Sequence, residues 1–167
     1  MKTRVAVILF AISFFLRPML QVFLPESLTL DLILCIYIAL VITSDRDNFA
    51  GPMLAAFIFM VVSDIIFSQF VGVTPLAMLA ATGTAYVLKS RYDAGNILLN
   101  LANMVVSFLV FHISFWIMYR FLGSPYSFAY MMVRLPWLLL TECVITGIII
   151  LIIIRAKIQK MRNDYFK

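Results

Sequence analysis

Residues 134–154 read RLPWLLLTECVITGIIILIII, and this stretch decides the class of fold. Between Arg134 and Arg155 the only charged residue is Glu142. A transmembrane helix needs about 20 consecutive, mostly apolar residues, because the hydrocarbon core of a bilayer is about 30 Å thick. The stretch therefore predicts a membrane-spanning helix rather than a helix of a soluble domain.

The rest of the chain has the same character. Of its 167 residues, 64% are hydrophobic and 13% are charged, and the mean hydropathy is +1.06. Soluble domains have about 45–50% apolar and about 25% charged residues. We therefore expect an all-α membrane protein in which residues 1–167 form a single polytopic membrane domain.

Six segments have the length and composition of spanning helices. They are residues 5–24, 28–44, 49–70, 72–89, 97–120 and 134–154. The third and fourth form one long apolar run, which Gly72 and Pro75 divide, because proline is tolerated in the first turn of a helix but not in its interior. The prediction is a compact bundle of six transmembrane helices.

The distribution of positive charge predicts the orientation of this bundle. If the N-terminus is cytoplasmic, ten of the thirteen Lys and Arg residues lie on the cytoplasmic side, and only Arg120 and Arg134 lie outside. Cytoplasmic loops are enriched in Lys and Arg, so both termini are expected in the cytoplasm. The basic tail, residues 155–167, suits an anionic membrane surface or a simple stop-transfer anchor. The net charge of +5 thus reflects membrane topology and not nucleic-acid binding.

Four ionisable side chains fall inside predicted spans: Arg17, Asp64, His112 and Glu142. At about 1.5 Å per residue, each lies about 9–12 Å below the outer end of its helix. Charges at membrane depth need partners, so we expect a polar layer in which Arg17 pairs with Asp64, Glu142 or both. The layer could hold the helices in order, or it could be a ligand or ion site. If Arg17 pairs with Asp64, Asp64→Asn should partly rescue Arg17→Ala.

Two other patterns have helical spacing. A polar stripe on the fifth segment consists of Asn96, Asn100, Asn103, Ser107 and Ser114. Such a stripe hydrogen-bonds neighbouring helices or lines a cavity. Small residues four apart on the fourth segment form a predicted helix-packing face: Ala77, Ala81 and Ala85. Small residues let helices approach closely, either within the protein or against a partner.

Motifs for catalysis are missing from the sequence. It contains no phosphate-binding glycine loop, no H-E-x-x-H and no G-x-S-x-G. Cys35 and Cys143 lie in apolar runs without metal-ligand spacing, and we expect both to be free thiols. The prediction is a protein that is not an enzyme and that uses no cofactor and no metal.

Residues 64–78 read DIIFSQFVGVTPLAM, and they resemble a pattern of the rod shape-determining protein MreD family. In that family an Asp near the end of the third helix is followed eight residues later by Gly-Leu or Gly-Val, and then by a helix containing Leu-Ala. The matching positions are Asp64, Gly72, Val73, Leu76 and Ala77. The segment 30–32 stands where the family commonly has Pro-Asp-Leu, but Leu30 departs from that pattern.

The resemblance implies a non-catalytic component of the bacterial elongation machinery in the cytoplasmic membrane. Such a protein partners MreC and, through it, MreB, RodA and a class B transpeptidase. It helps to position or regulate lateral peptidoglycan synthesis, and so cell shape.

An alternative function follows from the same resemblance. The MreD family is itself similar to the substrate-binding S components of energy-coupling-factor vitamin transporters, so the bundle is expected to be similar to theirs. An S component needs an outward-facing pocket, which the polar layer could line. S components commonly carry an A-x-x-x-A motif on their first helix, whereas Ala6 and Ala11 are five residues apart here.

Overall fold

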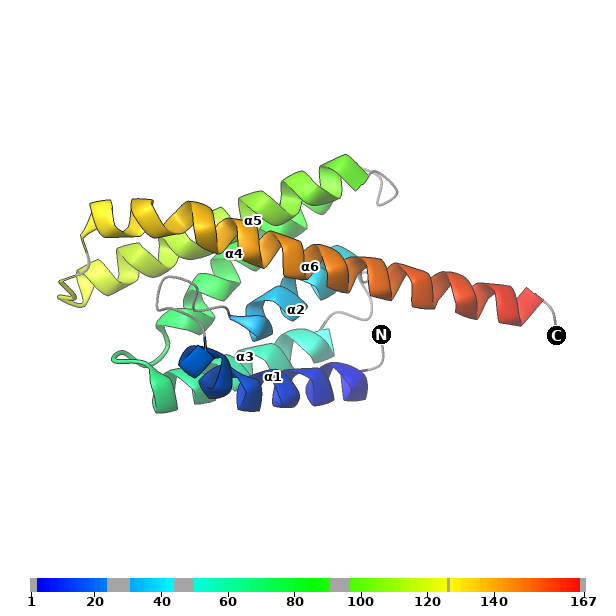
Figure 1. The fold of residues 1–167 in the computed structure, drawn as a ribbon, viewed down its shortest axis with the longest axis horizontal. Coiled ribbons are helices and arrows are strands. Elements are labelled where there is room, and N and C mark those ends of the chain that lie inside the picture. The colour runs from blue at the N-terminus through cyan, green and yellow to red at the C-terminus, as the bar shows by residue number, and fades with distance from the viewer. Residues whose placement is uncertain (1–2, 24–30, 44–49, 91–96, 126, 166–167) are drawn as a thin grey trace.

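The computed structural model describes residues 3–23, 31–43, 50–90, 97–125 and 127–165, and within these ranges it contains six α-helices (Figure 1). They are α1 (Thr3–Phe23), α2 (Leu32–Thr43), α3 (Ala50–Phe67), α4 (Val73–Lys89), α5 (Ile97–Phe121) and α6 (Phe128–Tyr165). All six segments that the sequence predicts to be helical are therefore confirmed as helices.

Three of these helices contain stretches that are long and apolar enough to cross a bilayer, among the residues that the structure describes. The stretches are Ala50–Phe67, Leu98–Phe121 and Phe128–Ala156. The segment Leu32–Thr43 is a shorter apolar helix. The all-helical fold is thus compatible with a helical membrane protein.

Helix α2 forms the centre of the core. Every residue from Ile33 to Ile42 is buried, and α2 contacts each of the other five helices. A helix that is apolar on all sides is stable only when it is surrounded, which explains this position. At twelve residues α2 is about 18 Å long, shorter than the bilayer core. Asp31 begins it, since its Oδ1 accepts a hydrogen bond from the Leu34 N–H at 3.2 Å.

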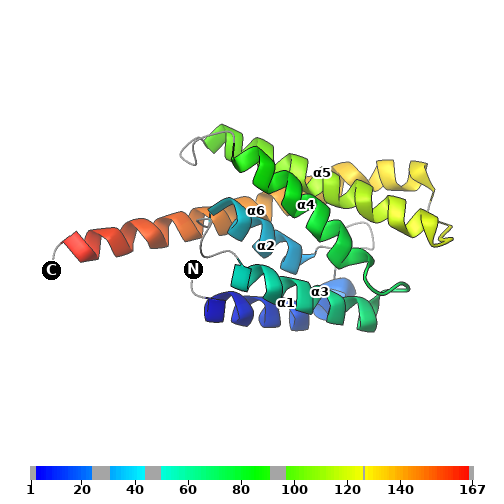
Figure 2. The ribbon, with the colours of Figure 1, turned by 180° about the vertical axis from the view of Figure 1, so that it is seen from behind.

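The other helices pack around α2 in two groups. α1 lies beside α3 on one side, while α4, α5 and α6 cover the other side, with α4 against α5 (Figures 1 and 2). The first residues of α1 and the last residues of α6 lie toward one end of the molecule (Figure 1). The turns from α3 to α4 and from α5 to α6 lie toward the opposite end (Figure 1).

The α3–α4 turn depends on Gly72. Its φ of 93° lies in the left-handed region, where a side chain is strained and glycine is not. This permits the reversal between Phe67 and Val73. Pro75 then lies in the first turn of α4, as the sequence predicts.

The predicted bounds of the last helix are wrong at both ends. α6 begins at Phe128 rather than at 134, and it continues through residues 155–165 of the predicted tail. Pro136 lies inside this helix. The continuation past 154 has a simple cause: residues 155–165 contain no Pro or Gly and several good helix formers. As a result, the end of α6 extends well beyond the other helices (Figure 1).

The polar stripe of α5 and the packing face of α4 meet each other. Asn103 Nδ2 donates a hydrogen bond to the carbonyl of Ala85 at 3.1 Å, and Ser107 Oγ donates to the carbonyl of Asn103. Ala77, Ala81 and Ala85 are fully buried, so this face packs within the protein and is not available to a partner. Asn100 and Ser114 are half-buried, and Asn96 lies outside the described residues.

Candidate functional site

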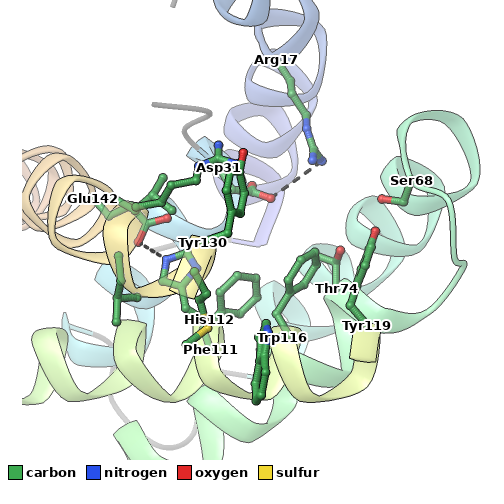
Figure 3. A pocket seen from close by; sticks show the side chains of 15 residues that line it. Arg17, Asp31, Ser68, Thr74, Phe111, His112, Trp116, Tyr119, Tyr130 and Glu142 are labelled. Carbon is green, nitrogen blue, oxygen red and sulfur yellow. Dashed lines mark hydrogen bonds and ion pairs between the residues drawn. The ribbon is translucent and has the colours of Figure 1, made fainter. Parts of the chain in front are cut away.

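A cavity of about 250 Å³ lies beside the α3–α4 and α5–α6 turns, since Ser68 and Thr74 line it near the first turn and Tyr119 and Tyr130 near the second. Its lining comes from α1, the start of α2, the α3–α4 region, α5 and α6 (Figure 3). Three of the four predicted layer residues line it, namely Arg17, His112 and Glu142. Asp64 is not among the lining residues. No described residue of the polar stripe of α5 lines the cavity either.

One charged group of the cavity joins α1 to α2 and α3. Arg17 Nη1 lies 3.8 Å from Asp31 Oδ2 and also donates a hydrogen bond to Ser63 Oγ. The guanidinium carbon lies 5.5 Å from the centre of the Phe67 ring, a cation–π distance. Arg17 is thus held by a carboxylate at the start of α2 and by a hydroxyl group and an aromatic face that both belong to α3.

A second polar pair joins α5 to α6. His112 Nε2 lies 2.8 Å from Glu142 Oε2, and Glu142 is only 1% exposed (Figure 3). Charged side chains inside a membrane bundle usually pair with one another and mark functional positions. Next to this pair, the Thr146 hydroxyl lies 3.5 Å from the Cys35 carbonyl oxygen on α2. The pair therefore lies where α2, α5 and α6 converge.

Asp64 has a different role from the predicted one. One of its oxygens accepts hydrogen bonds from the backbone N–H groups of Gly72 and Thr74, both at 3.0 Å, and the other accepts from the Ser68 hydroxyl at 3.1 Å. The backbone N–H groups at the start of a helix have no partner within it, and a carboxylate satisfies them. Asp64 is thus the cap of α4.

The prediction that Arg17 pairs with Asp64 or Glu142 is therefore wrong. Arg17 is held by Asp31, Ser63 and Phe67, whereas Glu142 pairs with His112. The depth estimate placed the charges at similar heights, but it carried no information about which side of each helix faced which neighbour. Asp31 was the missed partner, and its position at the start of the second helix was the signal that could have found it.

Much of the remaining lining of the cavity is aromatic, with Met131, Leu135 and Leu138 beside it, and the sequence did not predict this. Phe111, Phe115 and Tyr119 succeed one another on one face of α5, and Phe115 and Tyr119 stack with ring centres 4.4 Å apart. Trp116 also lines the cavity. The spacing of four residues between the three rings was the available signal.

The start of α6 completes this wall. Arg134 Nη1 donates a hydrogen bond to the Tyr130 hydroxyl at 2.7 Å, and its guanidinium carbon lies 5.1 Å from the centre of the same ring. Both residues line the cavity. The predicted helix, residues 134–154, does not include Tyr130, so the sequence does not predict that Tyr130 and Arg134 share one face of a helix.

The described side chains also define what the site could hold. Within the described ranges, no group of three or more His, Cys, Asp or Glu residues is placed to bind a metal ion. The cavity combines paired charges with flat aromatic surfaces, a lining typical of sites for small organic ligands.

Comparisons with known proteins do not identify the site. No family model matches the chain, and neither the curated proteins nor the solved structures include a significant match.

The observed partner of Arg17 makes a direct prediction. Arg17→Ala leaves the Asp31 carboxylate without its cation, so it should lower the free energy of unfolding by about 2–3 kcal/mol. Asp31→Asn in the same chain should restore about half of that loss, whereas Asp64→Asn should restore none. Unfolding of the detergent-solubilised variants by SDS titration would measure this. Rescue by Asp64→Asn instead would contradict the observed pairing.

Proposed function

We propose that the chain is a multi-pass protein of the bacterial cytoplasmic membrane, with six spans and both termini in the cytoplasm. The distribution of Lys and Arg supports this orientation. The fold is consistent with it, because the start of α1 and the end of α6 lie toward the same end of the bundle (Figure 1). The short helix α2 fits the proposal because its neighbours, rather than lipid, surround it.

We further propose that it is a non-catalytic component of the elongation machinery that partners MreC. One observation carries this proposal: the residues that resemble the MreD pattern form one structural unit. Asp64 caps the turn, Gly72 supplies its left-handed backbone, and Val73 and Ala77 are buried at the start of α4. Four of the five residues in the pattern thus have a structural role in this turn.

The exposed member of the pattern indicates where a partner could bind. Four of the five residues in the pattern have a role in the folded structure, whereas the Leu76 side chain is 52% exposed on α4. With the Ala77/Ala81/Ala85 face buried, the surface around Leu76 is the part of the pattern that a partner can reach. The outer faces of α1 and α6 and the aromatic end between α5 and α6 extend the exposed apolar surface.

Co-purification with MreC, co-expressed from the same genome and extracted in detergent, tests this proposal. The wild-type chain should retain MreC, and Leu76→Ala should reduce the retained amount several-fold without changing stability. Val87→Ala is the matched control, because Val87 is also 52% exposed and lies three turns further along the same face of α4. The absence of MreC from wild-type preparations, or equal retention by both variants, would contradict the proposal.

A second candidate is an S component of a vitamin transporter, and the cavity is the observation that favours it. The cavity lies at the end that the proposed topology places outside, where a substrate would enter. Co-purification with an ATPase and a T component, without MreC, would support this candidate over the first.

A further inference from the structure

We propose that the cavity binds a small, flat, ring-containing molecule that carries both a positive and a negative charge. This ligand site is separate from the partner surface on α4, so it goes beyond the proposed function as a scaffold. The second candidate function rests on the same cavity, and for that candidate the inference names the class of substrate. The argument rests on the size, the walls and the charge balance of the cavity.

The size sets the scale of the ligand. A cavity of about 150 Å³ is sufficient to hold benzene in a protein interior. The cavity between α1, α5 and α6 has a volume of about 250 Å³. It therefore has room for one or two fused rings with a short polar group.

The aromatic wall favours a flat ligand. Phe115 and Tyr119 are inclined by only 27° to each other, and Phe111 and Phe115 by 25°, so the three rings form a nearly continuous surface. Trp116 borders the same space (Figure 3). Aromatic rings prefer offset stacking or edge contact with other rings, which an aliphatic ligand cannot provide.

The charged side chains that line the cavity indicate which charges the ligand carries. Apart from His112, the charged side chains that line the cavity are Arg17, Arg134, Asp31 and Glu142, two of each sign. A ligand with a single charge can pair with only one of these two sets and is brought close to the other set, which carries the same sign. A zwitterion can place its negative group near the guanidinium groups and its positive group near the carboxylates.

The polar groups are already held in place before a ligand enters. His112 orients the Glu142 carboxylate, while Asp31 and Ser63 orient the Arg17 guanidinium. Groups that are fixed beforehand lose little conformational freedom on binding, which favours affinity. This arrangement distinguishes the cavity from a gap between helices.

Equilibrium dialysis of the detergent-purified full chain against radiolabelled L-tryptophan tests the proposal. We expect saturable binding at one site per chain. Unlabelled L-alanine, which lacks the ring, and benzoate and benzylamine, which carry one charge each, should displace it at least about tenfold less effectively than L-tryptophan. Absence of saturable binding, or equal displacement by any of these three compounds, would overturn the proposal.

Variants test the aromatic wall and the charge balance of the cavity separately. Trp116→Leu should weaken L-tryptophan binding about tenfold, whereas Trp137→Leu should leave it unchanged, because Trp137 is 62% exposed on α6 and does not line the cavity. Arg134→Gln leaves the lining with one excess negative charge, so benzylamine should then displace L-tryptophan more effectively than benzoate does. Unchanged binding in Trp116→Leu and unchanged competition in Arg134→Gln would each count against the site. Retention of MreC by these variants would show that a failed ligand test does not affect the partner proposal.

Discussion

Replacing Asp64 with alanine is expected to lower the free energy of unfolding by about 3–5 kcal/mol, a large loss for a single substitution. The carboxylate accepts two backbone hydrogen bonds and one hydroxyl hydrogen bond, and it is fully buried. Its removal leaves the N–H groups of Gly72 and Thr74 without this acceptor, and Thr74 is buried. SDS titration monitored by circular dichroism would measure the loss.

Two further variants make the Asp64 prediction specific. Asp64→Asn keeps one oxygen acceptor and should lose about half as much stability as the alanine variant. Ser68→Ala removes a single hydrogen bond at a half-buried position and should cost about 1 kcal/mol. A cost for Ser68→Ala equal to that for Asp64→Ala would show that the cap on α4 is not the source of the effect.

The second large effect is expected at Glu142. Glu142→Leu removes the partner of the His112 imidazole, and breaking a buried pair from one side costs about 3–5 kcal/mol. Replacing both partners, as in His112→Leu with Glu142→Leu, should recover most of this loss, because no unpaired polar group is left. The same titration on the two single variants and the double variant gives the coupling between the residues.

A conservative variant provides the control for Glu142. Glu142→Gln retains a hydrogen-bonding group opposite His112 and should cost less than about 1.5 kcal/mol. Additive losses in the double variant, with no recovery, would falsify the idea that the pair is the origin of the effect.

The helices were predictable because each is a run of apolar residues between polar or helix-breaking positions. Gly72 and Pro75 even divide two helices that hydropathy alone would join. The end of α6 was not predictable in the same way: the composition changes from apolar to basic at Arg155, but a helix tolerates that change. Hydropathy detects the edge of a membrane, whereas a helix ends where its backbone can no longer continue.

For the site, the sequence predicts which polar residues need partners but not which partners they have. That Arg17, Asp64, His112 and Glu142 need partners could be predicted from the cost of charge at membrane depth. Which partners they have depends on the rotation of each helix about its own axis, and one sequence contains little information about it. Asp64 illustrates a second difficulty, since its partners are backbone groups, and any residue can supply those.

The aromatic wall was visible in the sequence as Phe111, Phe115 and Tyr119, but the same spacing describes an ordinary lipid-facing stripe. Only the position of α6 across from these rings, with Tyr130 and Arg134, makes them one side of a cavity. The pairing of the Asn103 side chain with Ala85 was easier to anticipate, because small residues and polar residues at matched spacing commonly meet between helices.

Helix α6 is continuous from Phe128 to Tyr165, so it connects the cavity to the last residues that the structure describes. Glu142, in the cavity, and Tyr165, near the end of the chain, belong to the same helix and are separated by about 35 Å along its axis. At this length, a tilt of about 10° about the cavity end would correspond to a displacement of about 6 Å at the far end. In the proposed topology, one continuous helix therefore joins the cavity on the outer side of the membrane to the basic residues on the cytoplasmic side.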